Sequence, residues 1–177
     1  MLFWHVGGTV AVIRYSFRDD RMDLRLLIVG ALLPDVIDTP LGLAGFGTFG
    51  SVRLFSHTIL FASVVMTVVV LATRRGRPRK RWMPLAIGIL THLVLDAMWT
   101  DAETLWWPFL GLDFATSGFG SAGALVTSIL TDWRVWALEM MGAGYLAYLV
   151  SRGNLTSPEE RARFAKTGRI AVPIDRS

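Results

Sequence analysis

Apolar stretches of helical length alternate with short polar connections along the whole chain. The clearest stretch, residues 54–73, has 20 residues and His57 as its only ionisable side chain. A helix of that length extends ~30 Å at ~1.5 Å per residue, which is the thickness of the hydrocarbon core of a bilayer. Four further stretches are apolar with few interruptions, and they cover residues 1–13, 22–38, 82–100 and 135–151. The pattern therefore predicts an all-α fold, a multi-pass transmembrane helical bundle with about five spans.

Two segments fall outside this pattern. Residues 121–131 are apolar but too short to cross a bilayer, so we expect a short interfacial helix or a re-entrant helix there. The tail is polar, and Ser157, Pro158 and Glu160 match the first positions of a capped helix. We therefore divide the chain into a membrane-embedded helical domain, residues 1–150, and a basic tail with a short helix, residues 151–177.

The composition is that of a membrane protein. Hydrophobic residues make up 53% of the 177 residues and charged residues only 18%, whereas soluble domains average ~25% charged residues. The seven Trp and 17 Gly point in the same direction, because both residue types are frequent in membrane proteins. The absence of Cys excludes disulfide scaffolds, thiolate metal sites and cysteine nucleophiles.

The positive charge predicts an orientation rather than a nucleic-acid partner. The net charge is +4, but sixteen of the eighteen Lys and Arg residues lie in three short blocks: residues 14–25, residues 74–81 and the tail from residue 152. If all five segments cross the bilayer, these blocks share one side, and the positive-inside rule makes that side cytoplasmic. We therefore expect an inner-membrane protein with its N-terminus outside, its C-terminus in the cytoplasm and no nucleic-acid ligand.

Six ionisable residues within or at the ends of the apolar segments form the candidate site. Each charged group costs ~2.5–3.5 kcal/mol inside hydrocarbon, so such residues are functional by default. The predicted topology places all six at a similar depth near the outer surface, although they come from four segments, and we expect them to converge. The six residues are His5, Asp35, Asp38, His57, His92 and Asp96.

The spacing and chemistry of these residues favour a metal site. His92 and Asp96 are four residues apart and Asp35 and Asp38 are three apart, so each pair shares one face of a helix. Three imidazoles and three carboxylates suit Zn²⁺, with Mn²⁺ or Fe²⁺ as alternatives, and they are enough for one or two ions. A mixed nitrogen and oxygen set favours an open site with a bound water, which is a nucleophile suited to phosphoester cleavage.

The residues around this set have more than one interpretation. Glu139 lies at a comparable depth, either as a partner of the metal ligands or as a proton carrier. Arg53 borders the site, where it either binds a phosphate or caps an acidic patch. Most of the Trp residues cluster toward the outer face, as in an interfacial aromatic belt.

Several motifs in a fixed order carry a family resemblance. After His5 come residues 33–40 (LPDVIDTP), 53–58 (RLFSHT), 88–96 (GILTHLVLD) and 103–108 (ETLWWP). Over roughly residues 1–112 this order resembles the YdjM-type membrane-bound metal-dependent hydrolases, which are distantly similar to zinc-dependent phospholipase C and nuclease enzymes.

The resemblance implies that the six candidate residues bind metal and that Glu103 is a further site residue. The sequence departs from the family pattern in two places. Asp35 and Asp38 stand three residues apart where many members have Asp-x-Asp, and Val52 precedes Arg53 where many members have His. The second departure removes one possible ligand.

We therefore predict a membrane-bound hydrolase that cleaves a phosphoester or ester of a lipid or envelope molecule at the outer face of the membrane. Arg53, which would stabilise developing negative charge, and Glu103 are its catalytic candidates. Two alternatives use the same His and Asp residues: a metal- or proton-linked transporter and a non-catalytic metal-binding scaffold. The inner halves of the spans have no ionisable residue to continue a transport path, which favours the hydrolase.

Overall fold

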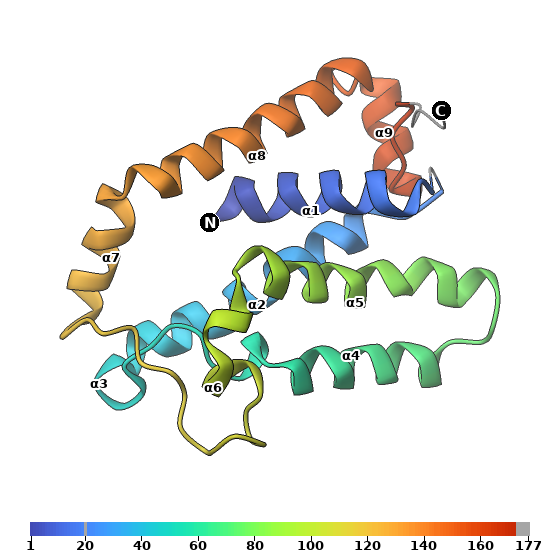
Figure 1. The fold of residues 1–177 in the computed structure, drawn as a ribbon. Coiled ribbons are helices and arrows are strands. Elements are labelled where there is room, and N and C mark those ends of the chain that lie inside the picture. The colour runs from blue at the N-terminus through green and yellow to red at the C-terminus, as the bar shows by residue number, and fades with distance from the viewer. Residues whose placement is uncertain (20, 173–177) are drawn as a thin grey trace.

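The computed structural model describes residues 1–19 and 21–172, and every regular element in this part of the chain is helical (Figure 1). The five long helices are α1 (Leu2–Phe17), α2 (Leu24–Ala44), α4 (Ile59–Ala72), α5 (Arg77–Leu95) and α8 (Trp133–Arg152). Four shorter helices are α3 (Phe46–Phe49), α6 (Ala102–Leu105), α7 (Ala122–Thr131) and α9 (Pro158–Thr167). Two 3₁₀ turns, η1 (Phe55–His57) and η2 (Met98–Thr100), complete the order. The all-α prediction is confirmed.

Each apolar segment contains a long helix, but several boundaries differ from the expected ones, among them three in α2 and α5. Helix α2 continues past residue 38 to Ala44, with Pro34 and Pro40 inside it. Helix α5 begins in the basic block at Arg77, with a Pro in its first turn, and ends at Leu95. The last residues of the expected 82–100 helix instead form η2, because Ala97 takes a left-handed conformation with φ 51°.

The expectation of one continuous helix over residues 54–73 is wrong. His57 lies in the 3₁₀ turn η1, and α4 begins only after it. Thr58 sets this start, because its backbone is extended and its hydroxyl accepts a 3.0 Å hydrogen bond from the Phe61 N–H. A Thr that caps a helix in this way stands outside the helix that it starts. His57 is therefore presented by a turn rather than by a helix.

Helix α2 is the one described helix that is both long enough and apolar enough to cross a membrane by length and hydropathy. Helices α4 and α7 are apolar but shorter. The 14 residues of α4 extend about 21 Å at ~1.5 Å per residue.

The long helices cross at glycines. A Cβ atom on Gly7 of α1 would overlap the backbone of Gly142 in α8, and one on Gly30 of α2 would overlap the backbone of Leu85 in α5. Only a residue without a side chain permits these close backbone approaches. Small residues at crossings are typical of helix packing in membranes, where van der Waals contact drives association.

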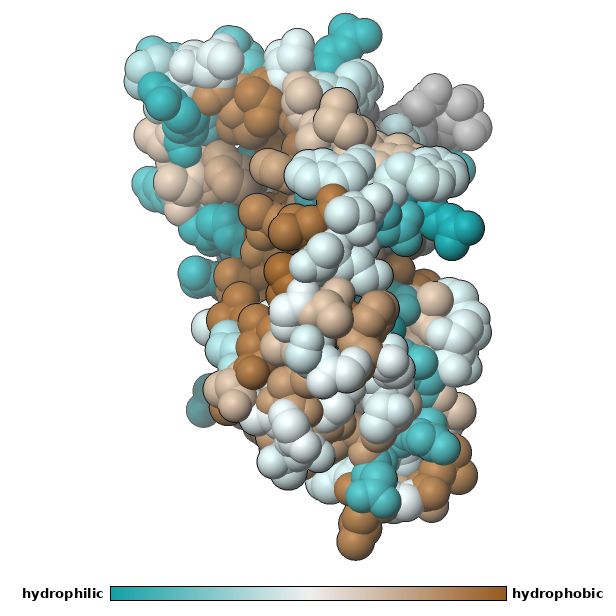
Figure 2. Space-filling view, turned by 90° about the vertical axis from the view of Figure 1, so that its left-hand side faces the viewer, coloured by the Kyte–Doolittle hydropathy of each residue, from teal (hydrophilic) through white to brown (hydrophobic). Residues whose placement is uncertain are grey.

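The surface of the bundle is apolar on all five long helices. Each of them carries a large hydrophobic side chain that is more than half exposed, such as Phe17, Val36, Leu71, Val94 and Met140. Figure 2 shows hydrophobic side chains running along one face, with hydrophilic ones mostly toward its edges. Continuous exposed apolar surface of this kind marks contact with lipid or with a partner protein.

The tail packs back onto the bundle. Ser157 caps α9 by accepting a 3.2 Å hydrogen bond from the Glu160 N–H, which confirms the predicted helix start. Beyond α9, Val172 is buried in a cluster with Val10 and Leu149, and its carbonyl oxygen accepts a 2.8 Å hydrogen bond from the Arg14 guanidinium.

Candidate metal centre

Four separate segments bring the six predicted site residues together. The first turns of α1 supply His5, the second half of α2 supplies the two Asp residues, η1 supplies His57, and the end of α5 supplies His92, followed by Asp96. All three imidazoles are at most 1% exposed, and no Lys or Arg side chain among the described residues pairs with any carboxylate of the set except at Asp96. Buried ionisable groups in such density require mutual pairing or a bound ion.

Two overlapping groups have the geometry of a metal site. The first consists of His5, His92 and Asp96, and the second of Asp35, His57 and His92. Within each group, one ligand atom of every residue lies within 4.8 Å of the others. We call these groups the two triads, and His92 belongs to both.

The far side of each imidazole ring is bound to an acceptor. The Nδ1 of His57 contacts Asp38 Oδ2 at 2.7 Å, and the Nδ1 of His92 contacts the carbonyl oxygen of Ala31 at 2.7 Å. The Nδ1 of His5 contacts the carbonyl oxygen of Met1. Because a carbonyl oxygen only accepts hydrogen bonds, each Nδ1 must carry the proton, and each neutral ring then has a lone pair on Nε2.

The Nε2 atoms face other members of the two triads. The Nε2 atoms of His57 and His92 are 3.2 Å apart, and His5 Nε2 lies 2.8 Å from Asp96 Oδ1. Asp35 Oδ1 lies 3.5 Å from His57 Nε2 and 3.8 Å from His92 Nε2. Lone pairs that face one another at hydrogen-bond distance repel unless a proton or a cation lies between them.

The donor set fits a divalent transition metal. Two ligands on one tetrahedral zinc, with bonds of ~2.0–2.1 Å, lie roughly 3.3 Å apart, close to the 3.2 Å between the two Nε2 atoms. Metal-bound His residues typically donate the other ring N–H to a carbonyl or a carboxylate, as these three do. The residues therefore could hold such an ion without rearrangement.

Asp38 takes part in neither triad and lies behind His57. It is completely buried, and its carboxylate accepts hydrogen bonds from the backbone N–H groups of Leu54 (2.8 Å), Ser56 (3.0 Å) and His57 (3.1 Å) as well as from the His57 ring. One carboxylate therefore fixes both the turn η1 and the orientation of the imidazole. The sequence placed Asp38 among the metal residues, whereas the structure turns its oxygens toward η1.

Asp35 forms the open edge of the cluster. It is 30% exposed, whereas Asp96 is 6% exposed. The cluster is therefore open to solvent at Asp35.

Arg53 joins the cluster to the loop beyond α5. Its Nε lies 3.0 Å from Asp96 Oδ2, and its Nη1 donates a 2.8 Å hydrogen bond to Asp101 Oδ2. Burial opposes the charge of the guanidinium, but Asp96 and Asp101 outweigh burial and raise the Arg53 pKa above its usual range. Asp101 was not identifiable as a partner from the sequence, because no spacing rule relates it to a residue 48 positions earlier.

Two other candidates lie outside the triads. Glu103 is exposed on α6 and belongs to neither triad. Glu139 of α8 accepts a 2.8 Å hydrogen bond from the Phe3 N–H in the first turn of α1, two residues before His5. It therefore contacts the helix that carries a candidate ligand, rather than the ligand itself.

Comparison with known proteins gives one family and one curated relative. The family model for the YdjM inner membrane protein matches residues 4–156. The inner membrane protein YbcI of Escherichia coli (strain K12) is 34% identical over 91 residues, which are 47% of this chain and 52% of the relative. The match thus spans about half the length of the relative. No solved structure matches.

Proposed function

This chain belongs to the YdjM inner membrane protein family, and we propose that it is a metal-dependent hydrolase that cleaves a phosphoester or ester of a lipid or envelope molecule at the outer face of the membrane. One observation carries the proposal: the three imidazoles and the carboxylates of Asp35 and Asp96 form two triads that share His92, and the Nδ1 of every ring is held by an acceptor. Metal-bound His residues are typically held in this way, with the other ring nitrogen left for the metal.

We assign the ligands to His5, His57, His92, Asp35 and Asp96. Zn²⁺ is the ion that this mixed set favours, with Mn²⁺ or Fe²⁺ as alternatives. The two triads share His92, and a single Nε2 lone pair binds only one ion. The arrangement therefore favours one ion between the two triads over two separate ions. Asp38 orients His57 and acts as a positioning residue.

A bound divalent ion supplies a water that is acidic enough to act as a nucleophile at neutral pH. The protein residues supply access, orientation and charge. Asp35 is the most exposed of the proposed ligands, so it marks the side from which a substrate would reach the ion. Arg53 is held by Asp96 on one side and Asp101 on the other, so its guanidinium is fixed beside the triads to stabilise negative charge that develops on the substrate. Glu103 is a weaker catalytic candidate because it is exposed and lies outside the triads.

The proposed topology has five crossings, made by α1, α2, α4, α5 and α8, with α7 at the outer interface. The ends of α1 and α4, the start of α5 and helix α9 lie toward one end of the molecule, and the start of α1 and the end of α5 lie toward the other (Figure 1). The first end carries the three basic blocks, so we assign it to the cytoplasm and the triads to the outer side.

Apolar packing supports hydrolysis over the alternative of transport. Two buried clusters pack the bundle: Val10, Ile13, Leu24, Leu27, Leu149 and Val172 in one, and Ala62, Ile89, Leu93 and Met98 in the other. A pathway for ions through the bundle requires polar groups on both sides of the site. The charged residues buried near the cytoplasmic end, Arg14 and Asp23, are already bound to the Val172 carbonyl oxygen and to Arg25.

The decisive experiment measures metal in protein purified without chelators, for the natural chain and for the His92→Ala/Asp96→Ala variant. We expect Zn, Mn or Fe in the natural protein and its loss in the variant. The control is Asp113→Ala, because Asp113 is an exposed carboxylate outside both triads. Metal-loaded protein would then be tested for release of headgroup from phospholipid vesicles.

Four results separate the candidate functions and test the ligand assignment. Absence of metal from folded natural protein contradicts the metal site, and metal that persists in the double variant contradicts the ligand assignment. Metal without hydrolysis of any phospholipid or ester favours the scaffold. Uptake of labelled metal into proteoliposomes favours the transporter.

A further inference from the structure

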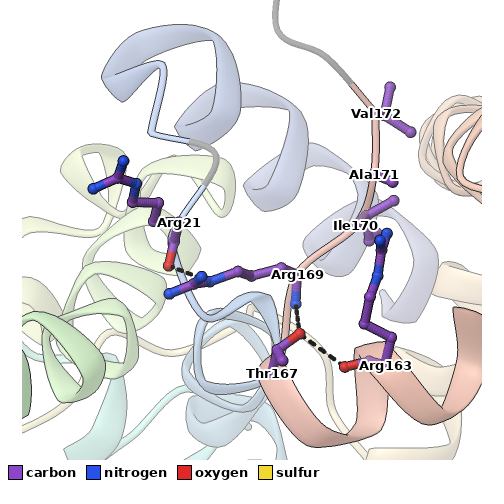
Figure 3. Close-up of a pocket in the computed structure, with 7 residues that line it drawn as sticks. All are labelled: Arg21, Arg163, Thr167, Arg169, Ile170, Ala171 and Val172. Atoms are coloured by element: carbon purple, nitrogen blue, oxygen red, sulfur yellow. Dashed lines mark hydrogen bonds between the residues drawn. The ribbon is translucent and has the colours of Figure 1, made fainter.

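A basic pocket lies between the α1–α2 connection and the C-terminal tail, toward the end of the molecule that carries α9 (Figures 1 and 3). We propose that this pocket binds the phosphate group of an anionic lipid. The cavity has a volume of about 570 Å³ and is lined by Arg21, Arg163, Thr167, Arg169 and residues 170–172. The inference concerns a site separate from the triads and does not depend on the proposed hydrolase activity.

Hydrogen bonds between distant segments build the walls of the pocket. The Leu24 N–H donates to the carbonyl oxygen of Gly168 at 2.8 Å, and Arg169 Nε donates to the carbonyl oxygen of Arg21 at 3.2 Å. Figure 3 shows Arg169 extended across to the Arg21 backbone. The tail is thus fastened to the start of α2, and the pocket is a defined feature of the fold.

Thr167 sets the direction of the chain after α9. Its hydroxyl donates to the carbonyl oxygen of Arg163 at 2.7 Å and accepts a 3.3 Å hydrogen bond from the Arg169 N–H (Figure 3). Gly168 follows the helix in a left-handed conformation with φ 69°, which turns the chain back toward the bundle. This turn carries Arg169 to the α1–α2 connection.

Among the residues that the structure describes, two of the three guanidinium groups have no carboxylate partner. Arg163 pairs with Glu160 at 2.6 Å. The Arg169 guanidinium has no carboxylate partner within the described residues, and the Arg21 side chain makes no hydrogen bond or ion pair with any of them. Guanidinium groups match the oxygens of a phosphate through paired hydrogen bonds, so phosphate is the ligand chemistry that this pocket favours.

The surroundings favour a lipid phosphate over a soluble one. Tyr15 and Phe17, on the last turns of α1 directly before the connection, are more than half exposed and present an apolar surface next to the basic segment. Basic side chains beside apolar surface are typical of segments that bind anionic headgroups of the cytoplasmic leaflet. The proposed topology places the pocket at that leaflet.

The experiment measures retention of phosphatidylglycerol by the full chain in detergent, by native mass spectrometry over a range of lipid concentrations. Phosphatidylcholine and inorganic phosphate are run in parallel. We expect preferential retention of phosphatidylglycerol and a loss of affinity of roughly fivefold for each guanidinium removed, and thus about 25-fold in Arg21→Gln/Arg169→Gln. The matched control is Arg74→Gln/Arg75→Gln, which removes the same charge from exposed residues at the same end of the molecule, outside the pocket.

The single variant Arg21→Gln separates a loss of binding from a folding defect. It leaves the attachment of the tail intact, because Arg169 binds the Arg21 carbonyl oxygen and not the Arg21 side chain. It should give the single fivefold loss with an unchanged melting temperature. Equal losses in pocket and control variants would overturn the proposal, as would equal retention of phosphatidylcholine. If inorganic phosphate displaced phosphatidylglycerol and bound with the same affinity, the ligand would be a soluble phosphate rather than a lipid.

Discussion

His57 and His92 face one another through their Nε2 atoms at 3.2 Å, although 35 positions separate them in the chain. Each ring is held from behind, His57 by Asp38 and His92 by the carbonyl oxygen of Ala31. The two partners fix both rings with Nε2 facing inward, as expected for the metal site that we propose.

The first prediction concerns the number of ions. Because the triads share the single free nitrogen of His92, we expect one equivalent of metal per chain and its loss in His92→Ala. Elemental analysis of protein of known concentration measures both. Two equivalents in the natural protein would show that His57 with Asp35 and His5 with Asp96 hold separate ions.

The second prediction concerns Asp38. In Asp38→Asn the side chain still accepts hydrogen bonds from backbone N–H groups, but it no longer holds the His57 ring with a charged oxygen. Removal of such a supporting carboxylate weakens metal binding by roughly 10- to 100-fold in other metalloproteins. We expect a loss in this range with the helical content unchanged, measured by metal competition with a chromophoric chelator and by circular dichroism.

Asp35→Asn provides the comparison for that experiment. If Asp35 is a direct ligand, its variant should lose more affinity than Asp38→Asn. A larger loss in Asp38→Asn would show that Asp38, as the sequence first suggested, binds the ion itself.

The convergence of the site residues was predictable from the sequence, whereas their individual roles were not. Hydrophobic segments and basic blocks together predict that His5, Asp35 and His92 lie toward the same side of the membrane, and the structure brings these residues together. The role of Asp38 depends on three backbone N–H groups of the segment 54–57, whose course no periodicity describes.

The start of α4 illustrates a second limit. The apolar run begins at residue 54, so hydropathy alone extends the helix over His57. A capping Thr58 is a local signal for a later start, but a Thr is also common inside apolar helices of membrane proteins, and the length of ~20 residues argued for one span. The cap formed by Thr58 and the hydrogen bonds to Asp38 together favour the turn η1 over a longer helix α4.

The third prediction tests the crossing of α1 and α8. A Cβ on Gly142 would overlap backbone atoms of Phe3 and Trp4, whereas a Cβ on Gly144 of the same helix meets no atom within 4 Å. Gly142→Ala should therefore destabilise the fold by about 1–3 kcal/mol through overpacking. Gly144→Ala should be neutral or stabilising by up to about 1 kcal/mol, because Ala favours the helix.

Thermal unfolding in one detergent measures both variants. Since α1 carries His5, Gly142→Ala should also reduce the metal content while Gly144→Ala leaves it unchanged. Equal stability of the two variants would show that α1 and α8 are not in backbone contact.

The last prediction tests the orientation. The chain has no Cys, so a single introduced Cys is labelled without background. Leu112 lies in an exposed loop beyond the triads, and Arg75 lies in the exposed connection between α4 and α5. In the proposed topology these two residues are on opposite sides of the membrane, because α5 crosses between them. A membrane-impermeant maleimide added to spheroplasts should label Leu112→Cys at once and Arg75→Cys only after lysis. The reverse labelling pattern would show that the orientation is opposite to the proposed one, with the triads on the cytoplasmic side. Labelling of both positions before lysis would show that α5 does not cross the membrane.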